Sequence, residues 1–261
     1  MIEIPEATVL ARQINETLTG KKIAYAEANH TPHGFAWYSG DPKTYNDRLA
    51  GRSIAGAHVF SGNVRVLLGG MTLLLSTPVK YHEAGVALPK KHQFLSVFED
   101  GSAIACTVQM WGGMFCYPTG EEATGVPIGC YLSTAPTPMD EAFDRKHFDT
   151  LVDSVDKDKT SAKALLATGQ RIPGFGNGVL QDVLWHAGIH PKRRVSTLSG
   201  DELDSLFSSV KSVVSDMAAQ GGRDTERDLF GRPGGYKTIL SKNTLDHPCP
   251  ECGSDIKKES Y

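Results

Sequence analysis

The stretch that decides the fold is GQRIPGFGNGVLQDVLWHAGIHPKR, residues 169–193. Its first ten residues form a glycine-rich turn, and the apolar spacing over 177–187 predicts a helix that ends at Gly188, with Ile189 placed for the hydrophobic contact of a glycine C-cap. Such a turn exposes backbone N–H groups beside the positive end of a helix, which favours a bound anion such as phosphate. Because the turn matches no nucleotide-binding pattern, a plain helix–helix connection remains the alternative.

The neighbouring segments also indicate helices. Residues 161–169 are rich in alanine and leucine, and Ser199 and Glu202 form a capping box before a periodic apolar segment that ends at Gly221-Gly222. Upstream, residues 135–141 are proline-rich and acidic, which is typical of a linker. Everything from this linker to residue 222 is therefore predicted to be helical.

The segment before the linker has a different pattern. A first helix is predicted from Pro5, with Glu6 suited to its positive end and Leu10, Ile14 and Leu18 on one face, up to Gly20. From residue 21 to about 133, short apolar runs alternate with turn dipeptides, which predicts consecutive antiparallel strands. These runs are Val64–Leu68, Thr72–Leu75, Phe94–Phe98 and Ala103–Cys106. The fold class is therefore α+β, with a β-sandwich or flattened barrel followed by helices.

Three units are expected along the chain. They are a β-sandwich domain over 1–134, a helical domain over 135–222 and a C-terminal region over 223–261. The 261 residues are 40% hydrophobic and 22% charged, which excludes a disordered, collagenous or purely coiled-coil protein. No apolar run is long enough to span a membrane and the N-terminus lacks a signal pattern, so we expect a cytoplasmic protein.

The charge of the chain does not by itself indicate a nucleic-acid partner. Residues 1–150 carry 12 Lys and Arg against 15 Asp and Glu, and residues 151–261 carry 15 against 15. A nucleic-acid binder usually shows a basic surplus, so any basic surface here must be local. Residues 190–194, His-Pro-Lys-Arg-Arg, are the clearest candidate.

Metal-ligand patterns are sparse. Of five cysteines, only Cys249 and Cys252 form a tight C-x-x-C, the spacing at which one tetrahedral zinc ion takes two thiolates. Two further ligands are missing, so two free surface thiols remain the alternative. The histidines His30, His33 and His82 are possible ligands, although a lone histidine is more often an ordinary surface or core residue.

Several segments, taken in order, resemble the formamidopyrimidine-DNA glycosylase/endonuclease VIII family of base-excision repair enzymes. The helical stretch over 173–193 is the most specific match, because it is similar to the helix–two-turn–helix signature of that family. The other matching segments are Met1–Glu6, Leu49–Ile54, His92–Ser102, Phe230–Gly234 and Pro248–Gly253. The resemblance covers essentially the whole chain.

The resemblance implies a monomer that binds damaged double-stranded DNA between its two domains and flips the damaged nucleotide out of the stack. It implies phosphate contacts from Asn177 and the amides around Gly176, with Arg171, Lys192 and Arg193 as further DNA-binding candidates. It also implies a structural Zn²⁺ at Cys249 and Cys252, in a zinc-finger hairpin whose second cysteine pair would lie beyond Tyr261.

The candidate catalytic residues lie at the N-terminus and depart from the family pattern. The family uses the secondary amine of a proline exposed by removal of the first methionine, but residue 2 here is Ile2, which predicts that Met1 is retained with a primary amine. The family lysine expected near residues 61–63 is absent, and Met110 or Trp111 stands where the family has an Arg-Phe-Gly loop that fills the gap left by the flipped base.

Glu3 matches the family carboxylate, and Glu6 follows it in the same helical turn. A carboxylate near the sugar can act on the ring or orient a water molecule. The sequence therefore supports a glycosylase of the endonuclease VIII type that relies on Glu3 and has a weak or absent lyase step. The alternative is a catalytically degenerate protein that binds lesions, abasic sites or structured nucleic acid, and a remote third option is unrelated chemistry on the same scaffold.

Overall fold

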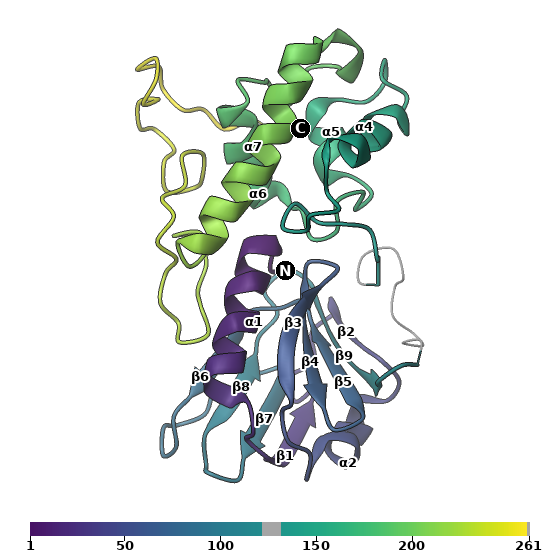
Figure 1. Cartoon of the computed structure of the whole chain (residues 1–261). Coiled ribbons are helices and arrows are strands. Elements are labelled where there is room, and N and C mark those ends of the chain that lie inside the picture. The colour runs from purple at the N-terminus through teal and green to yellow at the C-terminus, as the bar shows by residue number, and fades with distance from the viewer. Residues whose placement is uncertain (122–131, 260–261) are drawn as a thin grey trace.

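The computed structural model describes residues 1–121 and 132–259. Figure 1 shows a β-rich body and a helical body, with the first helix crossing from one to the other and the N-terminus at their junction. The sequence prediction of an α+β fold with an N-terminal helix, β-sheets and a helical domain is confirmed. Cys130, which the sequence places in the β-rich segment, lies outside the described residues.

The β-rich body contains two sheets. One sheet has the strand order β1-β7-β8-β6 and the other has the order β2-β9-β5-β4-β3. The strands predicted from alternating apolar residues are β4, β5, β7 and β8. The bounds are β1 (Ile23–Ala28), β2 (Ala36–Tyr38), β3 (Gly56–Phe60), β4 (Asn63–Leu68), β5 (Met71–Leu75), β6 (Val79–His82), β7 (Phe94–Phe98), β8 (Ala103–Cys106) and β9 (Gly112–Pro118).

One pairing differs from the expected antiparallel pattern. Strand β2 runs parallel to β9, with Ala36 opposite Gly112, and it lies at the edge of its sheet. The two strands are far apart in the sequence and share no hairpin, so nothing in their connection forces them to be antiparallel. Every other strand pair of the described residues is antiparallel.

The helices follow the predicted capping signals. Ser199 and Glu202 form the reciprocal capping box, and after the glycine-rich turn a helix runs to a left-handed Gly188, with the Ile189 N–H donating to Leu184 O at 3.0 Å. The bounds are α1 (Ile4–Leu18), α2 (Tyr45–Leu49), α4 (Arg145–Asp153), α5 (Ala162–Ala167), α6 (Asn177–His186) and α7 (Gly200–Ala219), with short 3₁₀ turns at Pro42–Thr44 and Val195–Thr197.

Helix α1 joins the two hydrophobic cores. Leu10, Ile14 and Leu18 are buried among residues of both sheets, whereas Ile4 at the start of the same helix packs in the helical core. Burying side chains of this size contributes about 1.5–3 kcal/mol each, so α1 is anchored on both sides of the junction. The residues immediately before and within its first turn are therefore held where the two bodies meet.

The segment after α7 also contacts both bodies. Leu229 is buried in the core of the sheets, and Tyr236 is buried in the helical core. Among the described residues, no helix is both long enough and apolar enough to cross a bilayer.

Candidate active site and nucleic-acid interface

The N-terminus lies in a partly enclosed position. Ile2 is buried, and its backbone N–H donates to Ser76 O at 3.0 Å. Met1 is half-buried and packs against the cluster of Leu74 and Phe115. The nitrogen of residue 2 is thus a hydrogen-bonded amide in this chain, and the amine at this place is the primary amine of Met1.

Burial lowers the pKa of the Met1 amine below its ordinary value of 8.0, because desolvation disfavours the charged form. The carboxylates of Glu226 and Glu3 oppose this shift but do not cancel it. The amine is consequently more available in its neutral, nucleophilic form near neutral pH than an exposed N-terminus would be.

Glu3 links the N-terminus to the helical domain. Its Oε1 accepts a hydrogen bond from Gly178 N–H at 3.0 Å and its Oε2 accepts one from Val179 N–H at 2.8 Å. These amides belong to the first turn of α6, where unpaired N–H groups and the helix dipole favour an anion. The anion that occupies this helix end is therefore the carboxylate of the chain itself.

Arg223 supplies the cation of the junction. It is 4% exposed, and its Nε and Nη2 donate to the two carboxylate oxygens of Glu6 at 3.0 and 2.8 Å. Its Nη1 lies 3.6 Å from Glu3 Oε1. The sequence placed Glu6 at the helix end and among the catalytic candidates, but its side chain is buried in this bidentate pair, so its observed contacts position Arg223.

Glycine is required where these groups approach α6. A methyl group at Gly178 would lie 1.5 Å from Arg223 Nη1, and one at Gly176 would lie 2.5 Å from the carboxyl carbon of Glu3. The glycine-rich turn therefore allows two charged side chains to reach the backbone of α6. Glu3 already occupies the amides of residues 178 and 179, so these two amides are not available to a phosphate. A phosphate contact from the amide of Gly176 stays a prediction.

At residues 61–63, where the family lysine is expected, the backbone of one body contacts the backbone of the other. Gly62, in the turn between β3 and β4, has φ +69° and faces Gly174 of the glycine-rich turn. A methyl group at Gly62 would lie 2.2 Å from the Cα of Gly174, so no side chain fits there without moving one of the two bodies. Ser61 and Asn63, on either side, are both buried.

The remaining DNA-binding candidates lie around α5 and α6. Asn177 is the first residue of α6 and is partly exposed. Arg171 donates from Nη1 to the carbonyl oxygens of Ala164 and Thr168 at 3.0 and 2.7 Å, at the end of α5. Arg171 therefore stabilises the turn before α6, and a contact with DNA would be additional to that role.

Lys192 and Arg193 follow α6 and are both paired with carboxylates. Lys192 Nζ donates to Glu259 at 2.8 Å, and Arg193 makes a bidentate pair with Glu202 at the start of α7. Their predicted role as DNA contacts remains a prediction. The two differ, however, because the Lys192 pair is with the C-terminal segment and the Arg193 pair is within the helical domain.

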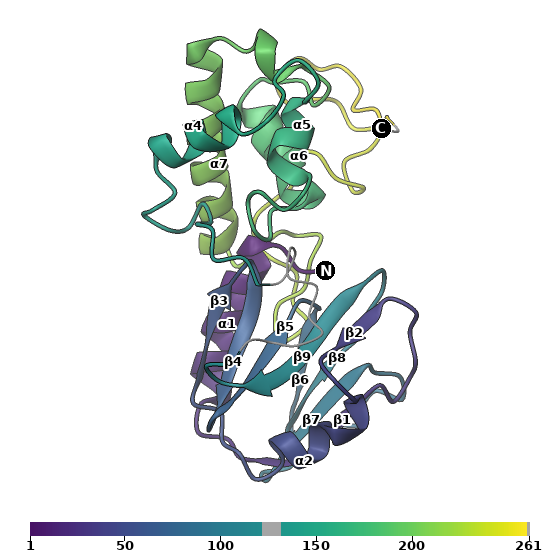
Figure 2. The same cartoon turned by 90° about the vertical axis from the view of Figure 1, so that its right-hand side faces the viewer.

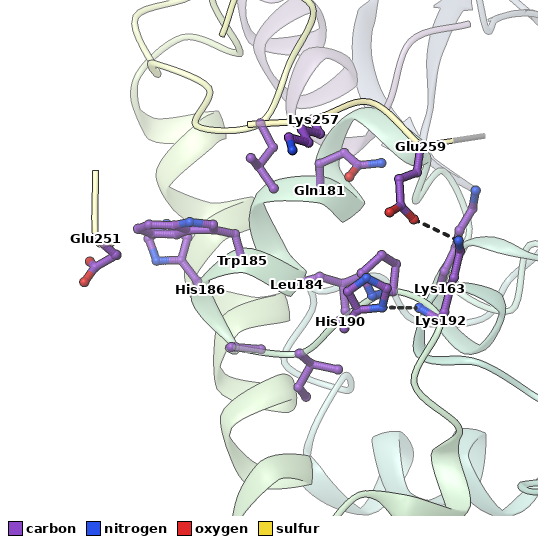
Figure 3. A pocket seen from close by; sticks show the side chains of 15 residues that line it. Lys163, Gln181, Leu184, Trp185, His186, His190, Lys192, Glu251, Lys257 and Glu259 are labelled. Atoms are coloured by element: carbon purple, nitrogen blue, oxygen red, sulfur yellow. Dashed lines mark hydrogen bonds and ion pairs between the residues drawn. The ribbon is translucent and has the colours of Figure 1, made fainter. Parts of the chain in front are cut away.

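A cavity of about 840 Å³ lies beside these residues, between α6 and the C-terminal segment. Figure 3 shows Trp185, His186 and Gln181 on the helix side, with Lys257 and Glu259 approaching from the C-terminal segment. Figure 2 shows this segment running along the helical body. The cavity is thus lined partly by polar side chains of a segment with little secondary structure.

Cys249 and Cys252, predicted as half of a zinc site, lie on one tight turn and are free thiols. The Cys249 N–H donates to Ser254 O at 2.7 Å and the Gly253 N–H donates to Cys249 O at 2.9 Å, so the segment folds back as a tight knuckle. Hydrogen bonds from the backbone N–H groups of Cys252 and Glu251 lower the pKa of the Cys249 thiol. The thiols fit zinc, but no third protein ligand among the described residues completes the set.

The two residues proposed to fill the gap left by a flipped base differ in exposure. Met110 is 73% exposed, in the loop before β9, whereas Trp111 is partly buried against the cluster of Phe115 and Tyr117. An exposed, unbranched side chain such as that of Met110 can enter a stack of nucleobases. The packing of Trp111 against Phe115 and Tyr117 anchors the loop. Met110 is therefore the better placed of the two, and its role remains a prediction.

Sequence reasoning missed three residues of the junction, namely Arg223, Glu226 and Ser76. Burial raises the pKa of Glu226, and its charge acts on both Arg223 and the Met1 amine. Arg223 follows Gly221-Gly222, and the end of a long helix was the only local signal of a special position. Its partners are more than 200 residues away in sequence, so no motif indicates the pair.

Comparisons with known proteins identify a matching domain and relatives over nearly the whole chain. The H2TH domain of formamidopyrimidine-DNA glycosylase matches residues 134–228. The formamidopyrimidine-DNA glycosylases of Lactobacillus delbrueckii subsp. bulgaricus and Geobacillus kaustophilus are each 26% identical to the chain, over 272 and 266 residues, and each alignment covers 99% of this chain and 94% of the relative.

Solved structures show the same fold. The Lactococcus lactis Fpg in complex with DNA containing an abasic site has a TM-score of 0.80 at 22% identity. The MutM (Fpg) protein of Thermus thermophilus has a TM-score of 0.79 at 20% identity. Both alignments cover 99% of this chain and 94% of the other.

The fold and the junction define a two-domain protein in which a β-sandwich with an N-terminal helix meets an H2TH domain. The family match, the relatives over nearly the full length and the shared fold agree with one another. The chain thus carries an H2TH domain of formamidopyrimidine-DNA glycosylase over residues 134–228, and over nearly its full length it is similar to the formamidopyrimidine-DNA glycosylase/endonuclease VIII family. It departs from the pattern of that family at residue 2, which is Ile2 and not proline.

Proposed function

We propose that this protein is a DNA glycosylase of base-excision repair, of the endonuclease VIII type, that binds damaged double-stranded DNA and releases the damaged base by hydrolysis. The observation that carries the proposal is Glu3, which is retained and held by Gly178, Val179 and Arg223 at the junction of the two domains. Relatives of the chain are named as glycosylases, and the solved structures with the same fold include a complex with DNA containing an abasic site.

The geometry of Glu3 suits a carboxylate that acts on the sugar or on water. A carboxylate offers about four acceptor positions, and the backbone of α6 uses two of them. A remaining lone pair orients a water molecule toward the sugar C1′. As the water oxygen bonds to C1′ and the glycosidic bond breaks, Glu3 accepts the water proton, and the departing base takes a proton from solvent.

A weak lyase step follows from the N-terminus. The nitrogen of Ile2 is a peptide amide whose N–H donates a hydrogen bond to Ser76 O, so it cannot attack the sugar. The Met1 amine has a lowered pKa and is chemically able to form a Schiff base, but it stands one residue further out than the family proline. We therefore propose that hydrolysis dominates and that strand cleavage by the amine is slow or absent.

A second candidate function is binding of lesions or abasic sites without catalysis. It is favoured by the close contact of Gly62 with Gly174, which fills the place of the family lysine with backbone. Under this proposal the junction binds DNA but lacks the groups that drive chemistry. A cytoplasmic, monomeric protein is expected under both proposals.

The test uses end-labelled duplexes that each carry one defined oxidised, alkylated or abasic site, analysed on gels with and without hot alkali. Breaks that appear only after alkali are expected, since alkali cuts wherever a base has been removed. Breaks without alkali would instead assign a lyase step to the Met1 amine. Lesion binding without any cleavage would support the second candidate.

Glu3→Gln tests the role of the carboxylate. We expect base release to fall by at least about 100-fold, the lower range for a general base, while lesion binding is retained. The matched control is Glu16→Gln on the exposed face of α1, which should leave the rate unchanged. An unchanged rate in Glu3→Gln would remove Glu3 from the mechanism.

A further inference from the structure

A cluster of Glu27, His30 and His92 lies in the sheet domain. Glu27 is in β1, His30 follows the end of β1, and His92 precedes the start of β7, which pairs with β1. The Asn29 N–H donates to Gln93 O at 2.8 Å and the Thr31 N–H donates to His92 O at 3.0 Å, so backbone pairing continues beyond the strands. This pairing brings the three side chains together.

The distances within the cluster fit one bound ion. His30 Nδ1 lies 3.1 Å from Glu27 Oε1, and His92 Nε2 lies 3.2 Å from Glu27 Oε2. Ligand atoms at zinc distances in a tetrahedral arrangement are about 3.3 Å apart. All three ligand atoms lie within 4.8 Å of one another, and no other group of three or more His, Cys, Asp or Glu among the described residues meets this condition.

The position of the protons on His92 supports a cation. Its Nδ1 lies 3.1 Å from the carbonyl oxygen of Pro89, which only accepts hydrogen bonds, so Nδ1 carries a proton. In a neutral ring, Nε2 then presents a lone pair to the Glu27 carboxylate, and two acceptors face each other unless a cation lies between them. Metal-binding histidines characteristically donate the other ring N–H to such a backbone carbonyl.

The burial and stacking of the rings provide a second line of support. His92 is 4% exposed, and its ring stacks on that of His30 with centroids 4.5 Å apart. The stacking holds both rings in place, with Nδ1 of His30 and Nε2 of His92 next to the Glu27 carboxylate.

We propose that Glu27, His30 and His92 bind one divalent ion of the zinc class, separately from the Cys249 and Cys252 knuckle. Two imidazole nitrogens and one carboxylate oxygen are a ligand set that zinc uses in proteins, and a water molecule completes the coordination. His30 is exposed, so the fourth position opens to solvent.

The ion would fix loops that lead toward Met110. Gln93, next to His92, accepts from the Val108 N–H at 2.8 Å and donates to Thr31 O at 2.9 Å. Val108 is two residues before Met110, so the cluster is connected to the loop proposed to face DNA. The role of the ion is therefore structural, and it does not depend on the proposed glycosylase activity.

The test uses tag-free protein in a Cys249→Ser, Cys252→Ser background, so that the knuckle contributes no thiolates. After treatment with a chelator and reloading with Zn²⁺, the metal retained on desalting is measured by mass spectrometry, and Co²⁺ titration reports the ligand set by visible absorption. We expect one equivalent of zinc in this background. Glu27→Gln and His92→Asn should each lose it, and His82→Asn, on β6 and outside the cluster, should retain it.

His92 is buried, so its replacement could fail to fold, and His30→Ala on the exposed side provides a second variant. It should weaken zinc binding by at least about tenfold, with an unchanged circular dichroism spectrum. Zinc binding that survives in Glu27→Gln and His30→Ala, or no zinc retained in the cysteine-free background, would overturn the proposal and leave an ordinary carboxylate–histidine pair. No DNA is used, so this outcome is independent of the glycosylase test.

Discussion

The two ends of the chain contrast sharply. At the N-terminus, Glu6 and Arg223 are buried and Glu3 is partly buried, and the three connect both bodies through several hydrogen bonds. At the C-terminus, Cys249 and Cys252 are held by a short knuckle with exposed surroundings, and Lys192 contacts this segment through an exposed ion pair. The N-terminal group is therefore set by the fold, whereas the C-terminal group depends on little beyond its own turn.

This difference indicates how strongly the structure constrains substitution at each end. A buried ion pair that loses one partner leaves an uncompensated charge, so its members change together or not at all. Exposed pairs contribute about 0–1 kcal/mol and are replaced easily. Glu3 lies in the first environment, and Cys249 and Cys252 lie in the second.

The largest expected effect comes from Arg223→Ala. It leaves Glu6 buried without its cation, which should lower the free energy of unfolding by about 3–5 kcal/mol. Urea unfolding followed by circular dichroism measures the loss. Lys237→Ala, with an 81% exposed side chain that is 3.9 Å from Asp224, is the control and should change stability by less than about 0.5 kcal/mol. Equal losses of stability in the two variants would show that the buried Arg223 pair contributes no more than an exposed one.

Gly62→Ala should lower stability, because the added methyl group forces the backbones of Gly62 and Gly174 apart. Both Gly62 and Gly20 have positive φ, but only Gly62 faces another backbone, so the difference between Gly62→Ala and Gly20→Ala isolates the contact. We expect Gly62→Ala to cost about 1–3 kcal/mol more, as overpacking does. Thermal unfolding of the two variants measures this difference, and indistinguishable melting temperatures would show that the contact is loose.

The amine of Met1 should titrate below 8.0. Competitive labelling with an amine-reactive ester, read by mass spectrometry of the N-terminal peptide across pH, gives the midpoint. Between the lowered pKa and 8.0 the folded chain binds fewer protons than the unfolded chain, so this group makes stability rise with pH. A midpoint at or above 8.0 would mean that Glu226 and Glu3 outweigh burial.

The smallest effect is expected on the surface. Lys192→Ala should weaken binding to all duplexes and reduce the salt slope of log K by about one, because its ion pair with Glu259 is exposed and weak, so a phosphate competes with Glu259 for the lysine. Arg193→Ala should change the slope less, since Glu202 already engages both ends of its guanidinium. Fluorescence anisotropy at several salt concentrations measures both slopes. A slope reduced equally in the two variants would place both residues in the interface, and slopes unchanged from the unsubstituted protein would place neither residue there.

Local patterns were sufficient for most of the fold. The capping box at Ser199, the glycine C-cap at Gly188 and the alternating run over Phe94–Phe98 each depend on neighbours within a few residues, so the sequence alone predicts them. The parallel edge strand β2 was not predicted, because its partner β9 is more than 70 residues away and no turn connects them.

The sequence by itself determined the resemblance to the family, the glycine-rich turn before Asn177 and the capping box at Ser199, since all three are carried by short motifs. Only the tertiary structure decided what Glu3 contacts, that Glu6 pairs with Arg223, and that His30 and His92 meet at Glu27. The physical reason is distance along the chain. Burial and charge pairing act through space between residues that no local pattern relates, so the cluster exists only after β1 and β7 have paired, and the contacts of Glu3 and Glu6 only after both bodies have packed around α1.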